Sequence, residues 1–318
     1  MVPDCRLCWD DYGAPCEGFG YCIDRLGAYL AGVNVDQAHI EKPLIYKQVR
    51  VWRDGQLTSQ QVAVIAEEPL VVLVNGQQVA VLMRLPGDEK ELAAGFLVSE
   101  GIVPGFDAIL TIYHCGEDFP SPISQNSQPS VEWRNRVEVK VAPNSLRPDA
   151  LFDVLRLVRA GCGAADVRAS ARQYTPVSST STFDAQTLLE AAHHLREDQP
   201  IHLQAGGVHA AGLYSVQGER IALYEDVGRH NAVDKACGFC LLWNIPLADK
   251  ALLCSGRLSY EMVSKVINMG IPVVASISAP TALALELADI GNVTVAGYLR
   301  GGRMTVYTHP ERIVFPGG

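Results

Sequence analysis

Apolar and polar positions alternate along much of the chain between residues 45 and 87. The two runs are 47–55 (KQVRVWRDG) and 60–87 (QQVAVIAEEPLVVLVNGQQVAVLMRLPG), and Asn75-Gly76 separates two apolar stretches within the second. A period of two is typical of strands, and Asn-Gly between apolar runs is a strong signal for a hairpin. The pattern predicts a small sheet, which residues 137–143 (VEVKVAP) rejoin.

The spacing becomes helical over residues 88–101 (DEKELAAGFLVSEG), which begin with acidic residues and end on glycine. Both signals are those of helix termini, so we expect a helix packed on the small sheet. Residues 117–130 are rich in Ser, Pro, Asn and Gln and predict an exposed loop. Residues 174–182 (YTPVSSTST) predict a linker.

Helical and strand patterns alternate in the C-terminal half. The expected elements are a helix at 184–196, a hairpin at 208–226, a helix from Gly228-Arg229, a strand at 251–255, a helix from Arg257, a strand at 271–277, a helix from Pro280 and a strand pair at 293–309. This order predicts an α/β fold with a cytidine-deaminase-like C-terminal domain, beside a smaller, strand-rich N-terminal α+β domain.

Composition is that of a folded chain with about two domains. Of the 318 residues, 48% are hydrophobic and 19% are charged, which argues against disorder and coiled coils. The expected regions are a cysteine-rich extension (1–35), the N-terminal α+β domain (36–150), a linker with a catalytic cysteine loop (151–183) and the cytidine-deaminase-like domain (184–318).

Net charge and the lack of targeting signals limit the classes of partner and compartment that we expect. A net charge of −9 argues against a wide nucleic-acid surface, although it leaves room for a local basic site for one small anionic ligand. The first residues (MVPDCRLCWDDYGAP) lack a secretory pattern, and residues 271–285 are too short and proline-interrupted to span a membrane. We therefore expect a cytoplasmic protein whose cysteines are thiols or metal ligands.

Three predicted helices begin directly after strands, at residues 226–231, 255–259 and 278–281. In an open α/β sheet such helix N-termini gather at one edge and favour phosphate groups. Arg229, His230 and Arg257 would add positive charge there, and the pair Arg300 and Arg303 flanks a flexible turn suited to bidentate contacts. The alternative is that these junctions simply carry good helix caps.

The nine cysteines fall into different classes. Cys5, Cys8, Cys16 and Cys22 form the pattern C-x2-C-x7-C-x5-C, which leaves zinc, an iron-sulfur cluster and unliganded thiols open. Cys237 and Cys240 lie at helical spacing and, like Cys254 in a strand, fit a core role, because free cysteine is often buried. Cys115 stays unassigned, and His209 is ambiguous between a structural and a functional residue.

Cys162 is different again, since it lies between two glycines in residues 159–167 (RAGCGAADV). A thiol with little around it to bury it is suited to chemistry, although a thiol alone does not establish catalysis.

Six strings together resemble the formate dehydrogenase accessory sulfurtransferases, the FdhD family. They are AAGFLVSEGI, GGVHAAGL, EDVGRHNAVDK, SGRLSYEMVSK, ISAPTALALELA and YLRGGRMTVYTHPERI, between about residues 45 and 313. The resemblance implies a homodimer that accepts sulfane sulfur from a cysteine desulfurase. It also implies delivery of that sulfur to the molybdenum or tungsten bis-guanine-dinucleotide pterin cofactor, which is then loaded into formate dehydrogenase.

The same resemblance implies roles for single residues. Cys162 matches the first cysteine of the family's Cys-x-x-Cys loop, but Ala165 replaces the second, and Asp166-Val167 replaces the following Gly-Lys. Residues 298–303 match the stretch near the guanine-dinucleotide end: Tyr298, Leu299, Arg300, Gly301, Gly302 and Arg303. The prediction is that Cys162 alone carries the sulfur, and the alternative is an assembly chaperone that binds cofactor without sulfur chemistry.

A deaminase is the closest rival by fold. Its zinc site requires His-x-Glu or Cys-x-Glu at one helix start and Pro-Cys-x-x-Cys at another. The corresponding helix starts here read Gly-Arg-His-Asn-Ala and Ser-Gly-Arg-Leu-Ser, which supply neither the ligands nor the proton-shuttling glutamate.

Overall fold

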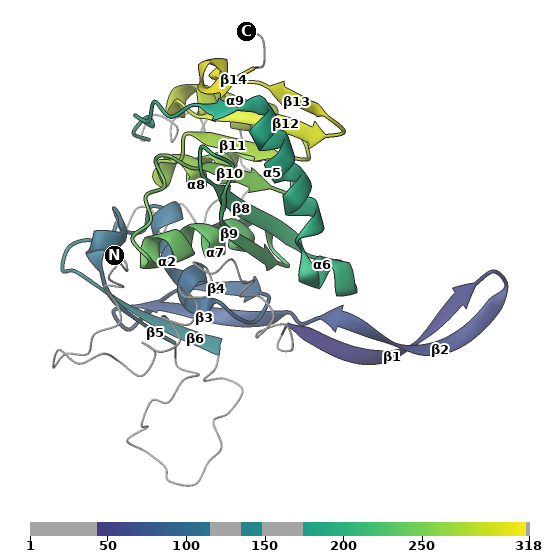
Figure 1. Ribbon diagram of the computed structural model, residues 1–318. Coiled ribbons are helices and arrows are strands. Elements are labelled where there is room, and N and C mark those ends of the chain that lie inside the picture. The colour runs from purple at the N-terminus through teal and green to yellow at the C-terminus, as the bar shows by residue number, and fades with distance from the viewer. Residues whose placement is uncertain (1–42, 115–134, 148–173, 316–318) are drawn as a thin grey trace.

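The computed structural model describes residues 43–114, 135–147 and 174–315. Two main sheets are stacked, with α2 and α7 between them, and a long two-stranded ribbon projects to one side (Figure 1). The N-terminal elements are β1 (Leu44–Arg53), β2 (Gln56–Ile65), β3 (Glu68–Val74), β4 (Gln77–Arg84), α2 (Glu89–Ser99), the 3-10 turn η2 (Phe106–Ala108), β5 (Ile109–His114) and β6 (Arg136–Val141).

The C-terminal elements alternate as the sequence predicts. They are β7 (Phe183–Asp184), α5 (Ala185–Glu197), α6 (Pro200–Ala205), β8 (His209–Tyr214), β9 (Arg220–Asp226), α7 (Arg229–Leu242), β10 (Ala251–Cys254), α8 (Tyr260–Asn268), β11 (Val273–Ser276), α9 (Ala282–Gly291), β12 (Thr294–Arg300), β13 (Arg303–Val306), η4 (Pro310–Arg312) and β14 (Ile313–Val314). The mixed α/β class is confirmed. The cytidine-deaminase-like assignment stays a prediction, and so do the four regional boundaries.

The small sheet has the strand order β4-β3-β6-β5. The predicted hairpin at Asn75-Gly76 is confirmed, and both residues have positive φ, 49° and 84°, as tight hairpin turns require. Apolar residues of β3, β5 and β6 share one core cluster with Leu92, Phe96 and Leu97 of α2. The predicted packing of this helix on the sheet is therefore confirmed.

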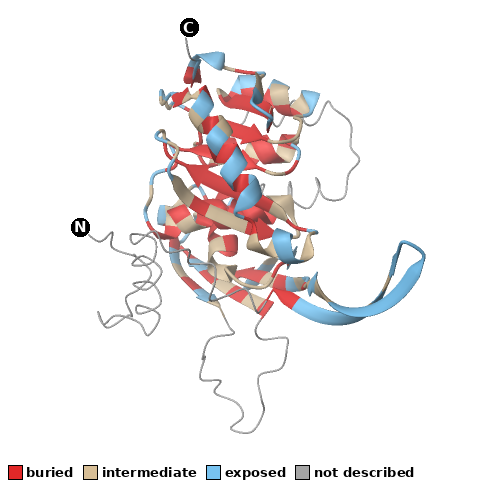
Figure 2. Ribbon diagram, turned by 45° about the vertical axis from the view of Figure 1, so that its right-hand side comes forward, coloured by how far each residue is buried: buried red, intermediate tan, exposed pale blue. Residues whose placement is uncertain are grey.

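The large sheet has the order β13-β12-β11-β10-β8-β9 and is covered on both faces. Alternate residues of β10 divide between two clusters: Leu252 and Cys254 pack with residues of α7, α8 and α9, whereas Ala251 and Leu253 pack with residues of α5. The first cluster also contains the core of the small sheet and α2, so one continuous core joins the two sheets (Figure 2).

Two glycines allow α2 and α7 to cross with their backbones in contact. A Cβ atom on Gly95 would lie 1.9 Å from the Asp234 carbonyl oxygen, and one on Gly238 would lie 1.8 Å from the Glu91 carbonyl oxygen. No side chain larger than hydrogen fits at either position without movement of a backbone. This crossing fixes the small sheet against the large one.

The ribbon formed by β1 and β2 is a separate two-stranded sheet. The sequence predicts its strands correctly but places them in one small sheet with β3 and β4. That placement is wrong, because the ribbon pairs only with itself among the described residues and turns at Asp54-Gly55. Its side chains are mostly exposed along its length (Figure 2).

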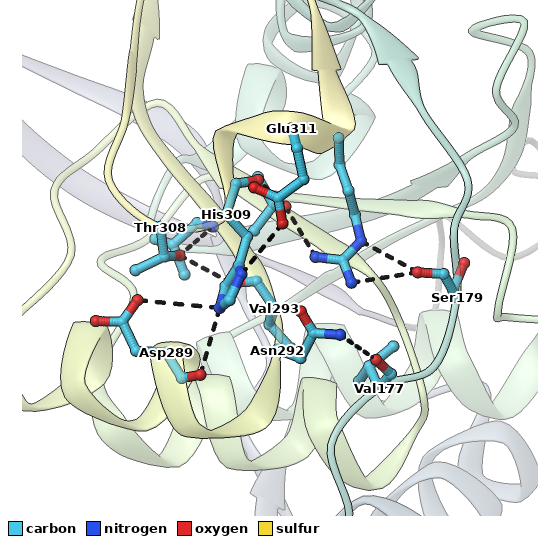
Figure 3. Close-up of polar contacts among 11 residues, drawn as sticks. Val177, Ser179, Asp289, Asn292, Val293, Thr308, His309 and Glu311 are labelled. Carbon is cyan, nitrogen blue, oxygen red and sulfur yellow. Dashed lines mark hydrogen bonds and ion pairs between the residues drawn. The ribbon is translucent and has the colours of Figure 1, made fainter.

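The segment at 174–182 has no regular structure, as expected of a linker, but it is fastened to the C-terminal residues (Figure 3). Arg312 donates from Nε and Nη2 to the Ser179 carbonyl, both at 3.2 Å, and the Asn292 amide donates to the Val177 carbonyl at 2.6 Å. Thr308 accepts from Val295 N at 2.9 Å. The first and last strands of this half, β7 and β14, then pair in parallel.

Candidate functional site

The features that the sequence predicts for anion binding lie along one edge of the large sheet, the edge formed by the carboxyl ends of its parallel strands. β9, β10, β11 and β12 run in the same direction, so the three strand-to-helix junctions at 226–231, 255–259 and 278–281 all lie at their carboxyl ends. The predicted gathering of these junctions is confirmed. The helix from Arg257 begins instead at Tyr260, because residues 255–259 form an extended loop whose Leu258 exchanges backbone hydrogen bonds with residues 279 and 281.

Arg229 and His209 meet over the loop that follows β10. A Cβ atom on Gly256 would lie 3.3 Å from both Arg229 Cδ and His209 Nδ1, so a larger residue there would crowd both side chains. Arg257 is the next residue and is exposed. Burial, together with the Arg229 charge, lowers the pKa of His209, which keeps its ring neutral at pH 7. The structure thus places His209, left ambiguous by the sequence, beside Arg229 and next to the loop that carries Arg257.

Arg229 Nε and His230 Nε2 are both buried, and neither has a hydrogen-bond partner among the described residues. A buried polar atom without a partner costs about 1–3 kcal/mol, so such atoms at a sheet edge are suited to meeting a ligand. Burial, Lys265 and Arg229 lower the pKa of His230 to about 4, against the opposing effect of Glu261 and Glu100. The expected positive charge on His230 is therefore wrong at neutral pH: the ring can offer a hydrogen bond but no charge.

A second basic group lies at the other end of the edge. The Arg300 and Arg303 guanidinium carbons are each 5.8 Å from the centre of the Tyr298 ring, within cation-π range. Both arginines are exposed, and Gly301 and Gly302 make the turn between them with φ of 59° and 70°. Leu299 points the other way, into the core, and is 1% exposed.

Tyr298 is held in an unusual backbone conformation. Its φ is 56°, a left-handed value that costs a residue with a side chain about 1–3 kcal/mol, and it lies in a bulge of β12. The Tyr298 amide donates to the Ser278 carbonyl at 3.0 Å, which ties the bulge to the loop before α9. The bulge takes Tyr298 out of the strand register and brings its ring within cation-π range of both arginines.

The two basic groups are separate along the edge. Arg229 follows β9, but its side chain lies beside Gly256 in the loop after β10, which also carries Arg257. The group at Arg300 ends β12, two strands from β10. At about 4.8 Å between strands, the ends of β10 and β12 are about 10 Å apart. The junction at 278–281, which follows β11, lies between them. The arrangement fits an elongated anionic ligand with charges near both ends better than a single phosphate.

The motif EDVGRHNAVDK has a structural as well as a site role. The Asp226 carboxylate is fully buried and accepts from Leu85 N at 3.1 Å, Lys235 Nζ at 2.8 Å, Gly228 N at 3.0 Å and Asn231 Nδ2 at 2.9 Å. Lys235 also donates to the Leu85 carbonyl at 2.9 Å. These bonds hold the start of α7 to the end of β4 and so fix where Arg229 and His230 stand.

A second buried pair continues this brace toward α8. Lys265 Nζ donates to both carboxylate oxygens of Asp234 at 2.9 Å, to Ser99 Oγ at 2.8 Å and to Glu100 at 2.6 Å. Burial raises the pKa of Asp234 to about 6, still below neutral pH. Burial alone would lower the pKa of Lys265, but Asp234 and Glu100 raise it, so the ion pair is charged at pH 7.

Sequence comparison identifies the family. The profile of the FdhD/NarQ family matches residues 65–314, which include both basic groups and the braces behind them. The chain belongs to the FdhD/NarQ family. Among curated FdhD/NarQ relatives, the sulfur carrier protein FdhD of Mycobacterium tuberculosis is 37% identical over 276 residues, covering 84% of this chain and 98% of the relative. That of Sulfolobus acidocaldarius is 34% identical over 262 residues, covering 82% and 95%.

A solved structure supports the same assignment. A crystal structure assigned as a formate dehydrogenase accessory protein from Desulfotalea psychrophila superposes with a TM-score of 0.66 at 26% identity. The match covers 85% of this FdhD/NarQ chain and 99% of that one. Among the helices of the described ranges, none has the length and apolar character needed to cross a bilayer.

The cysteines of this FdhD/NarQ chain divide as the sequence predicts where the structure describes them. Cys237, Cys240 and Cys254 are at most 2% exposed, and burial raises their pKa values well above the usual range, to about 12 for Cys240 and Cys254. Their core role is confirmed. Cys5, Cys8, Cys16, Cys22, Cys115 and Cys162 lie outside the described residues. In the described ranges of the chain, no group of three or more His, Cys, Asp or Glu side chains is placed so that it could hold a metal ion.

Proposed function

We propose that the protein is a sulfur carrier that serves the maturation of formate dehydrogenase. The observation that carries this proposal is the match, over most of both chains, to relatives called sulfur carrier protein FdhD. The structural neighbour assigned as a formate dehydrogenase accessory protein supports the same client. The proposed donor is a cysteine desulfurase, and the proposed acceptor is the molybdenum or tungsten bis-guanine-dinucleotide pterin cofactor before its insertion into the enzyme.

The proposed chemistry is a persulfide relay through Cys162. The Cys162 thiolate attacks the terminal sulfur of the donor's persulfide, the donor's sulfur-sulfur bond breaks, and the donor leaves as a thiolate. Cys162 then carries the transferred sulfur as its own persulfide and offers it to the metal of the cofactor. The family's Cys-x-x-Cys motif has a second cysteine where this chain has Ala165. The motif therefore lacks the second thiol that could form a disulfide with Cys162 and release the carried sulfur as sulfide.

The edge of the large sheet is the proposed seat of the cofactor, which is here a bound substrate. Arg300 and Arg303 would hold phosphates at one end of the guanine dinucleotide, with Tyr298 available for stacking against a base. Arg229 and Arg257 would meet charge at the other end, and neutral His230 would supply a hydrogen bond. With about 10 Å between them, the two groups could contact separate charged parts of one such ligand.

We place the protein in the cytoplasm as a homodimer, and we assign Cys5, Cys8, Cys16 and Cys22 to a zinc or iron-sulfur site. We do not assign deaminase activity, because the starts of α7 and α8 carry Arg229-His230-Asn231 and Ser259-Tyr260 where a deaminase requires zinc ligands and a glutamate.

The decisive experiment is mass spectrometry of the protein after incubation with a cysteine desulfurase and cysteine. We expect a gain of one sulfur on the peptide that contains Cys162, and its loss in Cys162→Ala. Cys115→Ala is the matched control and should gain sulfur normally. Absence of a persulfide on Cys162 would contradict the sulfur carrier proposal, and so would full formate dehydrogenase activity in cells that carry Cys162→Ala. Either result would favour the alternative, a chaperone that only binds the cofactor.

The cofactor seat is tested by calorimetric titration with GDP. We expect an Arg300→Ala, Arg303→Ala double variant to lose at least about tenfold in affinity, since two charge-assisted contacts are removed. Arg220→Ala is the control, because Arg220 begins β9 at the opposite end of the sheet and pairs with Asp198. Unchanged GDP affinity in the double variant would remove these arginines from the site.

A further inference from the structure

Glu261 brings a carboxylate to the first turn of α8, directly after the loop that follows β10. Ser259 Oγ donates to Glu261 Oε2 at 2.6 Å, which orients the carboxylate. Burial raises the pKa of Glu261, but the Ser259 hydrogen bond, its own backbone amide and the charges of His230 and Arg229 hold it below its usual value. An ionised carboxylate therefore lies close to Arg229 at this end of the sheet edge.

Arg229 and His230 each bring a buried polar atom to the same place. Arg229 Nε and His230 Nε2 have no hydrogen-bond partner within the described ranges of the chain. The Arg229 side chain and the His209 ring meet at Gly256, five positions before Glu261, where an added Cβ atom would lie 3.3 Å from both. We call Glu261, Arg229, His230 and His209 the Glu261 cluster. It combines side chains of β8, α7 and α8, so it is more than the start of one helix.

The charges of the Glu261 cluster offset one another. Arg229 is positive and Glu261 is negative, and both histidines are neutral at pH 7. A carboxylate beside a phosphate would repel it, so the cluster is less suited to phosphate than the pair Arg300 and Arg303. An acceptor-only carboxylate next to a guanidinium donor is instead suited to an uncharged ring that offers N–H groups beside a carbonyl oxygen.

We propose that the Glu261 cluster recognises the 2-amino-4-oxopyrimidine ring that guanine and pterin share. The amino group and the adjacent ring N–H would donate to the Glu261 carboxylate, and the carbonyl oxygen would accept from Arg229. Adenine presents an acceptor where guanine has this ring N–H, so the carboxylate discriminates against adenine. The inference rests on the proposed function, because the cofactor proposed there contains both rings. Arg257 on the same loop is exposed and remains for a charged group.

The position of the cluster fits a ligand that also reaches Arg300 and Arg303. The loop before Glu261 follows β10, and Arg300 ends β12, so the two strand ends are about 10 Å apart. One ribose separates a guanine base from its phosphates. A nucleotide with its diphosphate at the two arginines can therefore place its base at Glu261.

The test is calorimetric titration of the full chain with GDP and with IDP, which lacks only the 2-amino group. We expect the wild type to bind GDP at least about tenfold more tightly than IDP. Glu261→Gln should bind both equally, because the glutamine amide sets an N–H group against the amino group of guanine. Glu197→Gln on α5 is the control and should keep the preference, since Glu197 is exposed and pairs with His193.

Pterin and lumazine test the pterin ring in the same way, because lumazine has an oxygen in place of the 2-amino group. A preference for GDP over IDP that disappears in Glu261→Gln would place guanine at the cluster. A preference for pterin over lumazine that disappears in this variant would place the pterin there. Each preference is a ratio measured within one variant, so a lower folded fraction does not change it.

Two results would overturn the inference: a wild type without either preference, or preferences that Glu261→Gln retains. The Arg300→Ala, Arg303→Ala variant separates this failure from failure of the cofactor seat. It should lose affinity for GDP and IDP alike and keep their ratio. GDP binding that depends on the two arginines but not on Glu261 would remove only the ring site. Persulfide formation on Cys162 is measured separately, so the sulfur carrier proposal stands or fails on its own result.

Discussion

Gly95 of α2 faces the carbonyl oxygen of Asp234 on α7 so closely that a methyl group in place of its hydrogen would lie 1.9 Å from that oxygen. The contact is between two backbones, and neither can withdraw without moving its helix. Because α7 also carries Arg229 and His230 at its first turn, the crossing transmits any displacement of α2 to the candidate site.

Replacement of Gly95 by alanine should destabilise the fold by about 3 kcal/mol, the upper end of the usual cost of overpacking, despite alanine's better helix propensity. Urea denaturation measures the change in the free energy of unfolding. Gly105→Ala is the control, because nothing lies within 4 Å of the added methyl there and its backbone is extended. Equal stability of the two variants would contradict the close crossing.

Asp226→Ala should destabilise the protein by about 3–5 kcal/mol, because it leaves the Lys235 ammonium buried without its carboxylate and frees two backbone amides. The double variant with Lys235→Met should be less destabilised than the sum of the two single variants, as a coupled pair requires. Chemical denaturation of all four proteins completes the cycle.

Asp198→Asn is the control for Asp226→Ala, because it removes the carboxylate of an exposed ion pair instead of a buried one. Asp198 forms an ion pair with Arg220 at 2.7 Å, but both side chains are substantially exposed, so the loss should be at most about 1 kcal/mol. A loss at Asp198 as large as that at Asp226 would show that burial does not set the strength of these pairs.

His230 should make the fold sensitive to mild acid. Its folded pKa of about 4 lies below its ordinary value of 6.5, so the unfolded chain takes up the proton first. The stability that neutral His230 provides is complete above about pH 6.5 and is lost as the pH falls toward 4. Urea denaturation at pH 7.5 and pH 5 should show a larger loss in the wild type than in His230→Gln, at most about 2 kcal/mol for this partly exposed ring.

The groups that face His230 fix the sign of that effect. Lys265 and Arg229 oppose its protonation, whereas Glu261 and Glu100 favour it. Against the effect of burial, Asp234 and Glu100 raise the pKa of Lys265, so that ammonium stays charged throughout this range. Burial raises the pKa of Glu261, but the hydrogen bond from Ser259 and the nearby positive charges hold it below its usual value. The difference between the two proteins therefore reports His230. Parallel pH profiles of wild type and variant would contradict the buried, neutral ring.

Cys237, Cys240 and Cys254 should resist alkylation in the native protein. Burial raises the pKa of each thiol, and the thiolate is the reactive form, so iodoacetamide at pH 8 should leave these three unmodified. Peptide mass spectrometry after native and urea-treated labelling distinguishes protection from low intrinsic reactivity. Native labelling of Cys237 at the rate seen in urea would place it outside the core.

The sequence alone identifies most elements because their patterns are local. The α2 helix follows from acidic residues, helical spacing and a closing glycine, and the β3–β4 turn follows from Asn75-Gly76. The short pairs at β7 and β14 have two residues each, too few for any periodicity, and are missed. The isolation of the β1–β2 ribbon from the small sheet depends on tertiary pairing, which alternation cannot reveal.

The sequence predicts where the candidate site lies and which arginines it contains, but not the charge of His230 or the backbone of Tyr298. Junctions after parallel strands meet at one edge by topology, so Arg229, Arg257 and Arg300 could be placed there from sequence. The neutrality of His230 depends on burial and on Lys265, which is 35 positions away in the chain. The left-handed backbone of Tyr298 has no sequence signal, because tyrosine rarely adopts it.

The pairing of β14 with β7 has a consequence for synthesis on the ribosome. Ile313 and Val314 bind beside Phe183 and Asp184, and Arg312 fastens the segment at Ser179. The C-terminal half can therefore close only after residue 314 has emerged from the exit tunnel, although its first strand emerged long before. Until then the apolar face of α5 and the face of the sheet that it covers are exposed in the nascent chain and can aggregate. Chaperones that act during translation should therefore bind mainly to this half.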